Sequence, residues 1–356
     1  MLPLRAQSIP MPQILSIEDF LALTDSLPLV DVRSPKEFAL GHIPGAVNIP
    51  LFDNDERALV GISYKQGGKE NAVQLGLEIV GPKLADFVKQ ARKLAPKKKI
   101  LVHCWRGGMR SGSMAWLFET AGMTAYTLEG GYKAYRHYIR EAFSRPAELV
   151  VLGGNTGSGK TDILKEMEKL GEQFLDIEDL AHHKGSVFGP LGQEPQPTNE
   201  QFENNLAHVW RKFDVDKMIW VEDESRHLGF CGIPDPLFIQ MRQASLIKII
   251  VPKQEREKRL VREYGGFDKE SLAEQLVKIR ARMGGQHLKE AQKALEEGDL
   301  QKVADITLTY YDKAYQHGNR NRNQELVFEL EIAADDPKAT ANKVIEFVKT
   351  LKTVKR

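Results

Sequence analysis

The stretch LVVLGGNTGSGKT, residues 149–161, joins an apolar run to a glycine-rich loop. The ILKEMEKL segment that follows carries apolar residues at helical spacing, so the three pieces predict a strand, a loop and a helix. The loop fits the pattern G-x-x-x-x-G-K-[ST], whose backbone N–H groups and lysine bind a diphosphate. The sequence therefore predicts a phosphate-binding loop, with a Thr hydroxyl that can bind Mg²⁺, formed by Gly154, Asn155, Thr156, Gly157, Ser158, Gly159, Lys160 and Thr161.

A second motif, VEDESRHLG, lies at residues 221–229 and begins inside the apolar run MIWVED, a predicted strand. P-loop proteins place a Mg²⁺-binding carboxylate at the end of such a strand, and Glu222 or Asp223 suits this role. Arg226 is assigned to the same diphosphate site. The histidines nearby, His182, His183 and His227, are further polar candidates around that site. The alternative is a cluster of solvated charges at a strand end.

A cysteine loop, HCWRGGMRS, occupies residues 103–111 and follows the apolar run KILVHC. A loop that wraps around the cysteine sulfur points backbone N–H groups inward, and the next helix adds its positive N-terminal dipole. Such a nest stabilises a thiolate or a bound anion, as a nucleophilic cysteine requires. The candidate catalytic residues are Cys104, Arg106, Gly107, Gly108 and Arg110. The alternative, a buried core cysteine, needs neither the glycines nor the arginines.

The chain as a whole alternates predicted strands with amphipathic segments, which is typical of α/β proteins with largely parallel sheets. The first region has predicted strands at 29–33, 46–50, 99–104 and 125–131, with helices at 85–94 and 111–122. A polar segment with Pro146 marks a boundary. We therefore predict a domain at residues 14–140 and a P-loop α/β domain at 147–356, the latter containing a strand at 246–251 and a charged helical segment at about 254–302.

Composition limits the class of protein. The 356 residues suit two or three domains, and 42% of them are hydrophobic while 28% are charged. The sequence has no long apolar run and no signal-peptide pattern at its start, so we expect a cytoplasmic protein, a monomer, without membrane contact. Two cysteines, Cys104 and Cys231, are too few for a disulfide scaffold. A net charge of +1 restricts any nucleic-acid surface to a local patch.

The first region resembles the rhodanese domain. The resemblance rests on DVRSPKEFALGHIPGAVNIP, residues 31–50, followed by HCWRGGMRS. It implies a rhodanese-like fold with a parallel sheet and an active-site Cys104 that carries a persulfide or its equivalent. It also implies structural roles for Asp31, Arg33, His42 and Gly45.

The combination of both regions resembles the tRNA 2-selenouridine synthase family. The residues that carry this resemblance are HCWRGGMRSGSMAWLF, GGNTGSGKT, DLAHHKGSVFG, QPTNEQFEN and VEDESRHLG. It implies a transferase that attaches a geranyl group from geranyl diphosphate to the wobble 2-thiouridine of tRNA and then replaces the thioether with selenium from selenophosphate. Both compounds would be co-substrates, with no tightly bound cofactor, and a selenophosphate-supplying enzyme would be a partner. The P-loop would hold the isoprenoid diphosphate.

Two other functions remain open at this point. The first is a cysteine phosphatase or sulfurtransferase with an accessory P-loop domain, because HCWRGGMRS also satisfies HC-x5-R-S. A phosphatase would need an acid near Cys104 to protonate the leaving oxygen, and the loop contains none. The second is a nucleotide-controlled binding module in which both loops are degenerate, but neither motif has lost its glycines or its lysine.

The charged helical segment is a candidate tRNA-facing surface, because cationic side chains bind phosphates. The alternative is ordinary solvation of charged helices. The candidates are Arg256, Lys258, Arg259, Arg262, Arg280 and Arg282.

Overall fold

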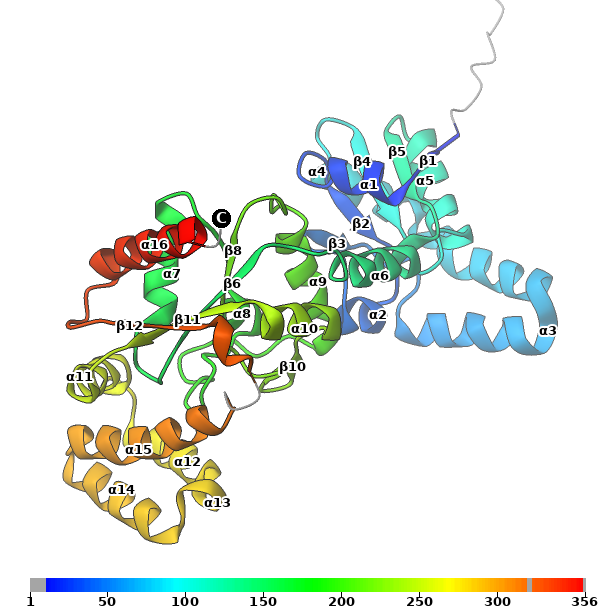
Figure 1. Cartoon of the computed structure of the whole chain (residues 1–356). Coiled ribbons are helices and arrows are strands. Elements are labelled where there is room, and N and C mark those ends of the chain that lie inside the picture. Colours follow the sequence, from blue (N-terminus) through cyan, green and yellow to red (C-terminus); the bar gives the residue numbers. More distant parts are fainter. Residues whose placement is uncertain (1–10, 319–321, 355–356) are drawn as a thin grey trace, which may run out of the picture. The chain divides into compact units, whose positions relative to one another are not determined.

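The computed structural model describes residues 11–318 and 322–354. The chain divides into two compact units, and it passes from one to the other between Ala142 and Phe143 (Figure 1). The start of the chain, where no signal peptide is predicted, lies outside the described residues. Among those that are described, no helix combines the length and the apolar character needed to span a bilayer.

The first unit contains a five-stranded parallel sheet in the order β1-β5-β4-β2-β3. The four predicted strands are confirmed, although the last ends at Leu128, because Gly130 and Gly131 adopt positive φ and Gly131 begins a helix. The short β1 has no predicted counterpart. The bounds are β1 Gln13–Leu15, β2 Leu29–Asp31, β3 Ala46–Asn48, β4 Lys99–His103 and β5 Thr124–Leu128.

Helices α4 and α5 bury apolar side chains against this sheet, and both are predicted from their periodicity. Helix α3 was not predicted from the sequence. It exposes most of its side chains, so its sequence lacks the apolar residues at helical spacing from which a helix is predicted. It breaks at Gly68, where φ is +81°. The helices are α1 Ile17–Leu23, α2 Pro35–Leu40, α3 Asn54–Val80, η1 Gly81–Lys83, α4 Leu84–Leu94, α5 Met109–Thr120 and α6 Gly131–Ala142.

The second unit contains a five-stranded parallel sheet in the order β12-β11-β6-β8-β7. Strands β6, β8 and β11 confirm the predicted strands, and β6 lies at the centre. A two-stranded antiparallel hairpin, β9 and β10, lies outside the sheet. The bounds are β6 Leu149–Gly154, β7 Gln173–Leu175, β8 Ile219–Glu222, β9 His227–Leu228, β10 Cys231–Gly232, β11 Ser245–Ile250 and β12 Val327–Glu331.

Helices α7 and α16 lie side by side against this sheet and share one hydrophobic core with it (Figure 1). The predicted helical segment forms a second core of its own, built from α11 to α15 and the loop around Phe188. The helices are α7 Lys160–Lys169, α8 Ile177–Ala181, α9 Asn199–Trp210, α10 Asp235–Gln243, α11 Lys253–Tyr264, α12 Lys269–Lys278, α13 Arg280–Met283, α14 Gly285–Glu297, α15 Leu300–Gly318, η2 Gln324–Leu326 and α16 Pro337–Val354.

Candidate functional site

The glycine loop connects the central strand β6 to the N-terminus of α7, as the motif predicts. Gly157 and Gly159 have φ of +78° and +77°, a conformation that favours glycine. No side chain caps the start of α7, so its first N–H groups are available to an anion. Lys160 Nζ lies 3.2 Å from the carbonyl oxygen of Gly154.

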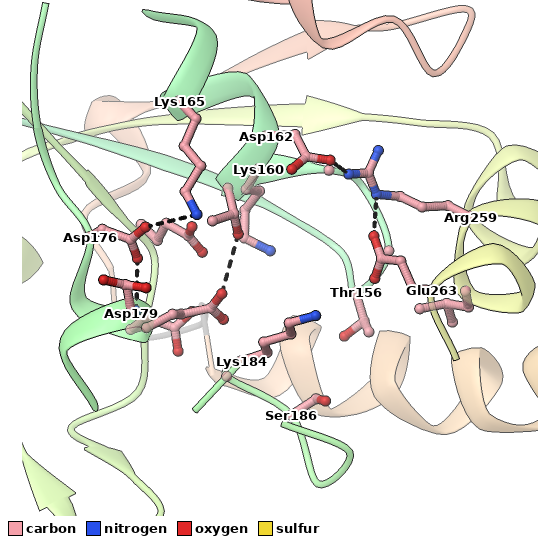
Figure 2. Close-up of a pocket in the computed structure, with 18 of the residues that line it drawn as sticks. Thr156, Lys160, Asp162, Lys165, Asp176, Asp179, Lys184, Ser186, Arg259 and Glu263 are labelled. Carbon is pink, nitrogen blue, oxygen red and sulfur yellow. Dashed lines mark hydrogen bonds and ion pairs between the residues drawn. The ribbon is translucent and has the colours of Figure 1, made fainter. Parts of the chain in front are cut away.

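A cavity of about 270 Å³ opens at this loop (Figure 2). Glu222 lies on its wall because β8 runs beside β6 and ends at the same edge of the sheet. The structure adds carboxylates that sequence reasoning missed, among them Glu178 at the start of α8 and Glu224 just after β8. The charged lining residues are the cations Lys160, Lys165, Lys184 and Arg259 and the acids Asp162, Asp176, Glu178, Asp179, Glu222, Glu224 and Glu263.

Three of these carboxylates form a cluster. Oxygens of Glu178, Glu222 and Glu224 lie within 4.8 Å of one another, and Thr161 Oγ1 donates to Glu178 Oε2 at 3.2 Å. Burial and the neighbouring acids raise the pKa of Glu178 to about 10 and that of Glu224 to about 8. Glu222 Oε1 is buried and has no hydrogen-bond partner among the described residues. An orphaned carboxylate oxygen beside two others, next to the loop threonine, fits a divalent cation.

Asp223 does not line the cavity and instead contacts the phosphate-binding loop through Tyr315. It accepts hydrogen bonds from Tyr315 Oη at 3.0 Å and from Arg322 Nη2 at 2.9 Å. The Tyr315 hydroxyl in turn accepts from the N–H of Gly154 at 2.9 Å. Of the two predicted carboxylates, Glu222 therefore faces the cavity, and Asp223 positions the first glycine of the loop through Tyr315.

We expect Asp223→Asn to lower the free energy of unfolding by about 2–3 kcal/mol, because it leaves the buried Arg322 guanidinium without its counter-charge. Chemical denaturation measures this. The matched control is Asp235→Asn, which removes the partner of the exposed Arg226 and should cost less than about 1 kcal/mol. Equal losses in the two variants would contradict the supporting role of Asp223.

The remaining predicted neighbours of the diphosphate do not line the cavity. Arg226 pairs with Asp235 on the exposed hairpin side. His182 Nδ1 lies 2.9 Å from the carbonyl oxygen of Pro195, and His183 is packed against Gly189. His227 is exposed on β9. The adjacent Lys184 lines the cavity instead; it lies within the quoted DLAHHKGSVFG stretch but was not among the predicted site residues.

Two predicted tRNA-facing arginines are buried, so this part of the prediction is wrong. Arg256 forms a two-pronged ion pair with Asp312 at 2.8 Å. Arg259 is bound by Asp162, Glu263 and Asp335, and it lines the cavity rather than the outer surface. Lys258, Arg262 and Arg280 are accessible, and the side chain of Arg282 lies outside the described residues.

The cysteine loop lies at the carboxyl end of β4, directly before α5. Gly107 has φ of +64°, and a Cβ there would lie 2.5 Å from the carbonyl oxygen of Leu128, so only glycine fits. Gly108 has an ordinary negative φ and precedes an α5 N-terminus that no side chain caps. Cys104 is buried, with Sγ 3.2 Å from Ser111 Oγ. The thiol thus lies beside a helix N-terminus, the anion-binding arrangement that the sequence predicts.

The two arginines of this loop differ. Arg110 donates to Glu37 Oε2 at 2.8 Å. Burial alone would raise the pKa of Glu37, but Arg110, the backbone N–H of Ser34 and Arg57 together hold that pKa below its usual value. Arg106 is exposed. Glu37 pairs with Arg110 and not with Arg106.

Below the loop, Asp31 and Arg33 form a buried ion pair at 2.6 Å, and the guanidinium stacks 3.7 Å above the Tyr132 ring. Burial acts to raise the pKa of Asp31, but His103 and Arg33 hold it below its usual value. Arg33 also donates to the carbonyl oxygen of Gly41. These contacts are structural, as the rhodanese resemblance implies.

Comparison with known proteins identifies both units. Residues 16–138 match the model of the rhodanese-like domain, and residues 147–266 match that of the tRNA 2-selenouridine synthase AAA domain. A tRNA 2-selenouridine synthase from Aeromonas salmonicida is 34% identical over 344 residues, which cover 85% of this chain and 90% of that protein. One from Bdellovibrio bacteriovorus is 44% identical over 64% of this chain and 62% of its own length. One from Nitrosomonas europaea is 38% identical over 70% of this chain and 67% of its own length. The chain belongs to the tRNA 2-selenouridine synthase family.

Proposed function

We propose that this enzyme converts the wobble 2-thiouridine of tRNA to 2-selenouridine in two steps, each assigned to one unit. In the first, the P-loop cavity holds geranyl diphosphate and transfers its geranyl group to the thiouridine sulfur. In the second, selenium from selenophosphate is delivered at the Cys104 loop. A carbon–selenium bond forms on the base, the carbon–sulfur bond breaks so that geranylthiol leaves, and water takes the phosphoryl group as phosphate. The observation that carries the proposal is that each unit has a strand-loop-helix junction with an uncapped helix N-terminus, an arrangement that suits an anion.

The first step breaks the bond between geranyl carbon and diphosphate oxygen and forms a carbon–sulfur bond, while the base loses its N3 proton. Negative charge develops on the departing diphosphate. Preorganised N–H groups and a cation stabilise such charge without reorganising at the moment of reaction. The loop N–H groups and Lys160 suit this task, since both face the cavity.

The charge of the cavity calls for a divalent cation with the diphosphate. Seven carboxyl groups and four cationic side chains line it, so the wall is net negative even when Glu178 and Glu224 carry protons, and it would repel a diphosphate. Mg²⁺ binds through carboxylates together with substrate phosphates. Thr161, Glu222, Glu178 and Glu224 are the residues that would hold it. Bound there, Mg²⁺ would neutralise the carboxylates and the leaving diphosphate.

We expect Glu222→Gln to weaken Mg²⁺ binding about tenfold or more, measured by calorimetry in the presence of inorganic diphosphate, because it removes a charged ligand. Glu166→Gln, on α7 but outside the cavity wall, is the control and should not change it.

Because the pKa values of Glu178 and Glu224 are raised to about 10 and about 8, both carboxyls carry protons near neutral pH and must lose them to bind metal. Affinity should therefore rise from pH 6 to pH 9. Geranylation that proceeds unchanged in excess chelator would contradict the metal proposal.

We propose that the exposed cationic side chains of the helical segment contact the tRNA phosphates. Lys258, Arg262 and Arg280 lie on α11 and α13, outside the phosphate cavity. We infer that an enzyme acting on tRNA works in the cytoplasm beside a supplier of selenophosphate, and that a single copy of the chain is enough for the reaction.

The experiment that tests the proposal is mass analysis of nucleosides from thiolated tRNA incubated with geranyl diphosphate and selenophosphate. The expected products are S-geranyl-2-thiouridine when selenophosphate is left out and 2-selenouridine when both compounds are present. Release of phosphate from an aryl phosphate, with no modified nucleoside, would favour the cysteine phosphatase instead.

A further inference from the structure

A second, apolar cavity opens directly beside the phosphate cavity. Thr156, Ser186, Leu260 and Tyr264 line both, and the first two are labelled in Figure 2. A Cβ on Gly157 would lie 3.3 Å from Leu260 Cγ, so the apolar wall begins at the phosphate-binding loop itself. Beyond this junction, the residues that line the apolar cavity alone are Phe188, Val261, Gly265, Leu272, Leu300, Val303, Ala304, Thr307 and Tyr311.

The two hydroxyl groups that line the apolar cavity alone, those of Thr307 and Tyr311, already form hydrogen bonds within the protein. Thr307 Oγ1 donates to the carbonyl oxygens of Val303 and Ala304, at 2.8 and 3.0 Å, which leaves its methyl group for packing. The Tyr311 hydroxyl accepts from the N–H of Val187 at 3.2 Å. A nucleobase or ribose placed here would lose its hydrogen bonds to water and find few in return, which is costly. A hydrocarbon has no such cost.

We propose that this cavity binds the hydrocarbon tail of the isoprenoid diphosphate, and that Leu272, Leu300, Val303 and Ala304 set the chain length that fits. The inference rests on the proposed function, since it places the tail of the same ligand. These four residues line the apolar cavity and not the phosphate cavity, so they lie away from the phosphates. Three of them come from one helix, α15, where Ala304 is the smallest side chain of the set.

The wall formed by Leu272 and Val303 is closely packed against other buried side chains. Leu272 and Val303 belong to a buried cluster with Leu276, Leu288 and Leu295. Close packing of this kind does not yield to extra carbon atoms without strain. An isoprene unit adds five carbons, and burial of each stabilises binding until the cavity is full. We therefore expect the ten-carbon geranyl diphosphate to bind about 100-fold more tightly than inorganic diphosphate, and the fifteen-carbon farnesyl diphosphate, whose last unit does not fit the filled cavity, to bind about tenfold more weakly than geranyl diphosphate.

The test measures the dissociation constants of inorganic, dimethylallyl, geranyl and farnesyl diphosphate with Mg²⁺, for the full chain and two variants. Ala304→Phe fills the cavity and should weaken geranyl diphosphate about 100-fold, while dimethylallyl and inorganic diphosphate bind as before. Leu300→Ala enlarges the cavity and should make farnesyl diphosphate bind as tightly as geranyl diphosphate does to the unaltered protein. The control is Leu295→Ala, which removes a buried leucine from the same helical core but not from the cavity wall.

The outcomes separate this inference from the function on which it rests. If the unaltered protein binds geranyl diphosphate no more tightly than inorganic diphosphate, the proposed function is wrong. If it discriminates by chain length but Leu300→Ala shifts the preference no more than Leu295→Ala, the tail lies elsewhere and this inference alone is overturned. Leu300→Ala decides the matter even if Ala304→Phe fails to fold.

Discussion

Geranylation of thiolated tRNA by the Lys160→Ala variant should be about 10²–10³-fold slower than by the unaltered enzyme. Lys160 is a cation on the wall of the phosphate cavity, at the first residue of α7, and it faces a cluster of carboxylates. Its removal takes away the charge that stabilises the departing diphosphate and also leaves Glu178 and Glu222 with less compensation. Both effects act on the same step, and quantification of S-geranyl-2-thiouridine over time measures it.

Selenation of pre-geranylated tRNA should survive in the same variant, because that step uses no diphosphate. The matched control is Lys169→Ala, which removes an exposed lysine from the other end of α7 and should leave both steps unchanged. If Lys160→Ala blocks selenation of pre-geranylated tRNA as severely as that of thiolated tRNA, the two steps share one composite site and the division between units is wrong.

The parts of the two sites that could be predicted from the sequence are those that are contiguous in it. A strand, a glycine loop and a helix form one local unit, so GGNTGSGKT and HCWRGGMRS were enough to place Lys160 and Cys104 at the carboxyl ends of strands. Glu178 joins the site only because β7 runs beside β8, and pairing between distant strands leaves no local pattern. The cluster with Glu222 and Glu224 was therefore missed.

Adjacent residues on a strand posed a different problem. Successive side chains in extended backbone point to opposite sides, so Glu222, the last residue of β8, and Asp223, directly after it, point different ways, but the motif does not say which of them faces the loop. The structure assigns the cavity to Glu222 and the contact with Tyr315 to Asp223. Tyr315 itself lies 161 residues from the glycine whose N–H it accepts, beyond the reach of any motif.

The error on the tRNA surface has a physical cause. Arg256 and Arg259 are three residues apart on α11 and so lie on one face of that helix, which packs against the phosphate-binding loop. Most of α11 is charged, so no apolar stripe marks its buried side. Carboxylates from distant segments, Asp312 for Arg256 and Asp335 for Arg259, make that burial tolerable. The sequence of α11 alone predicts an exposed helix, because the carboxylates that neutralise its buried arginines come from elsewhere in the chain.

Cys104→Ala should abolish selenation, by more than about 10³-fold, and lead to accumulation of S-geranylated tRNA. We propose this thiol as the reactive group of the first unit, and Cys104 does not line the phosphate cavity of the second unit, which its removal should leave intact. Cys231→Ala is the control. That thiol is buried, burial raises its pKa to about 11, and it contacts Gln196 and Pro197 rather than any anion site, so selenation should be unchanged.

Cys104→Ser distinguishes the two ways in which the loop can handle selenium. Serine retains a small polar side chain beside Ser111 but forms no bond to selenium, so a loop that only orients selenophosphate would keep much of its activity. If Cys104 instead takes selenium as a perselenide, the selenium–phosphorus bond breaks and phosphite leaves, and Cys104→Ser should be as inactive as Cys104→Ala. Exposure of the unaltered enzyme to selenophosphate should then add one selenium to the mass of the intact protein and release one phosphite. Loss of geranylation in either variant, with the unit still folded, would mean that Cys104 takes part in both steps and that the assignment of one step to each unit does not hold.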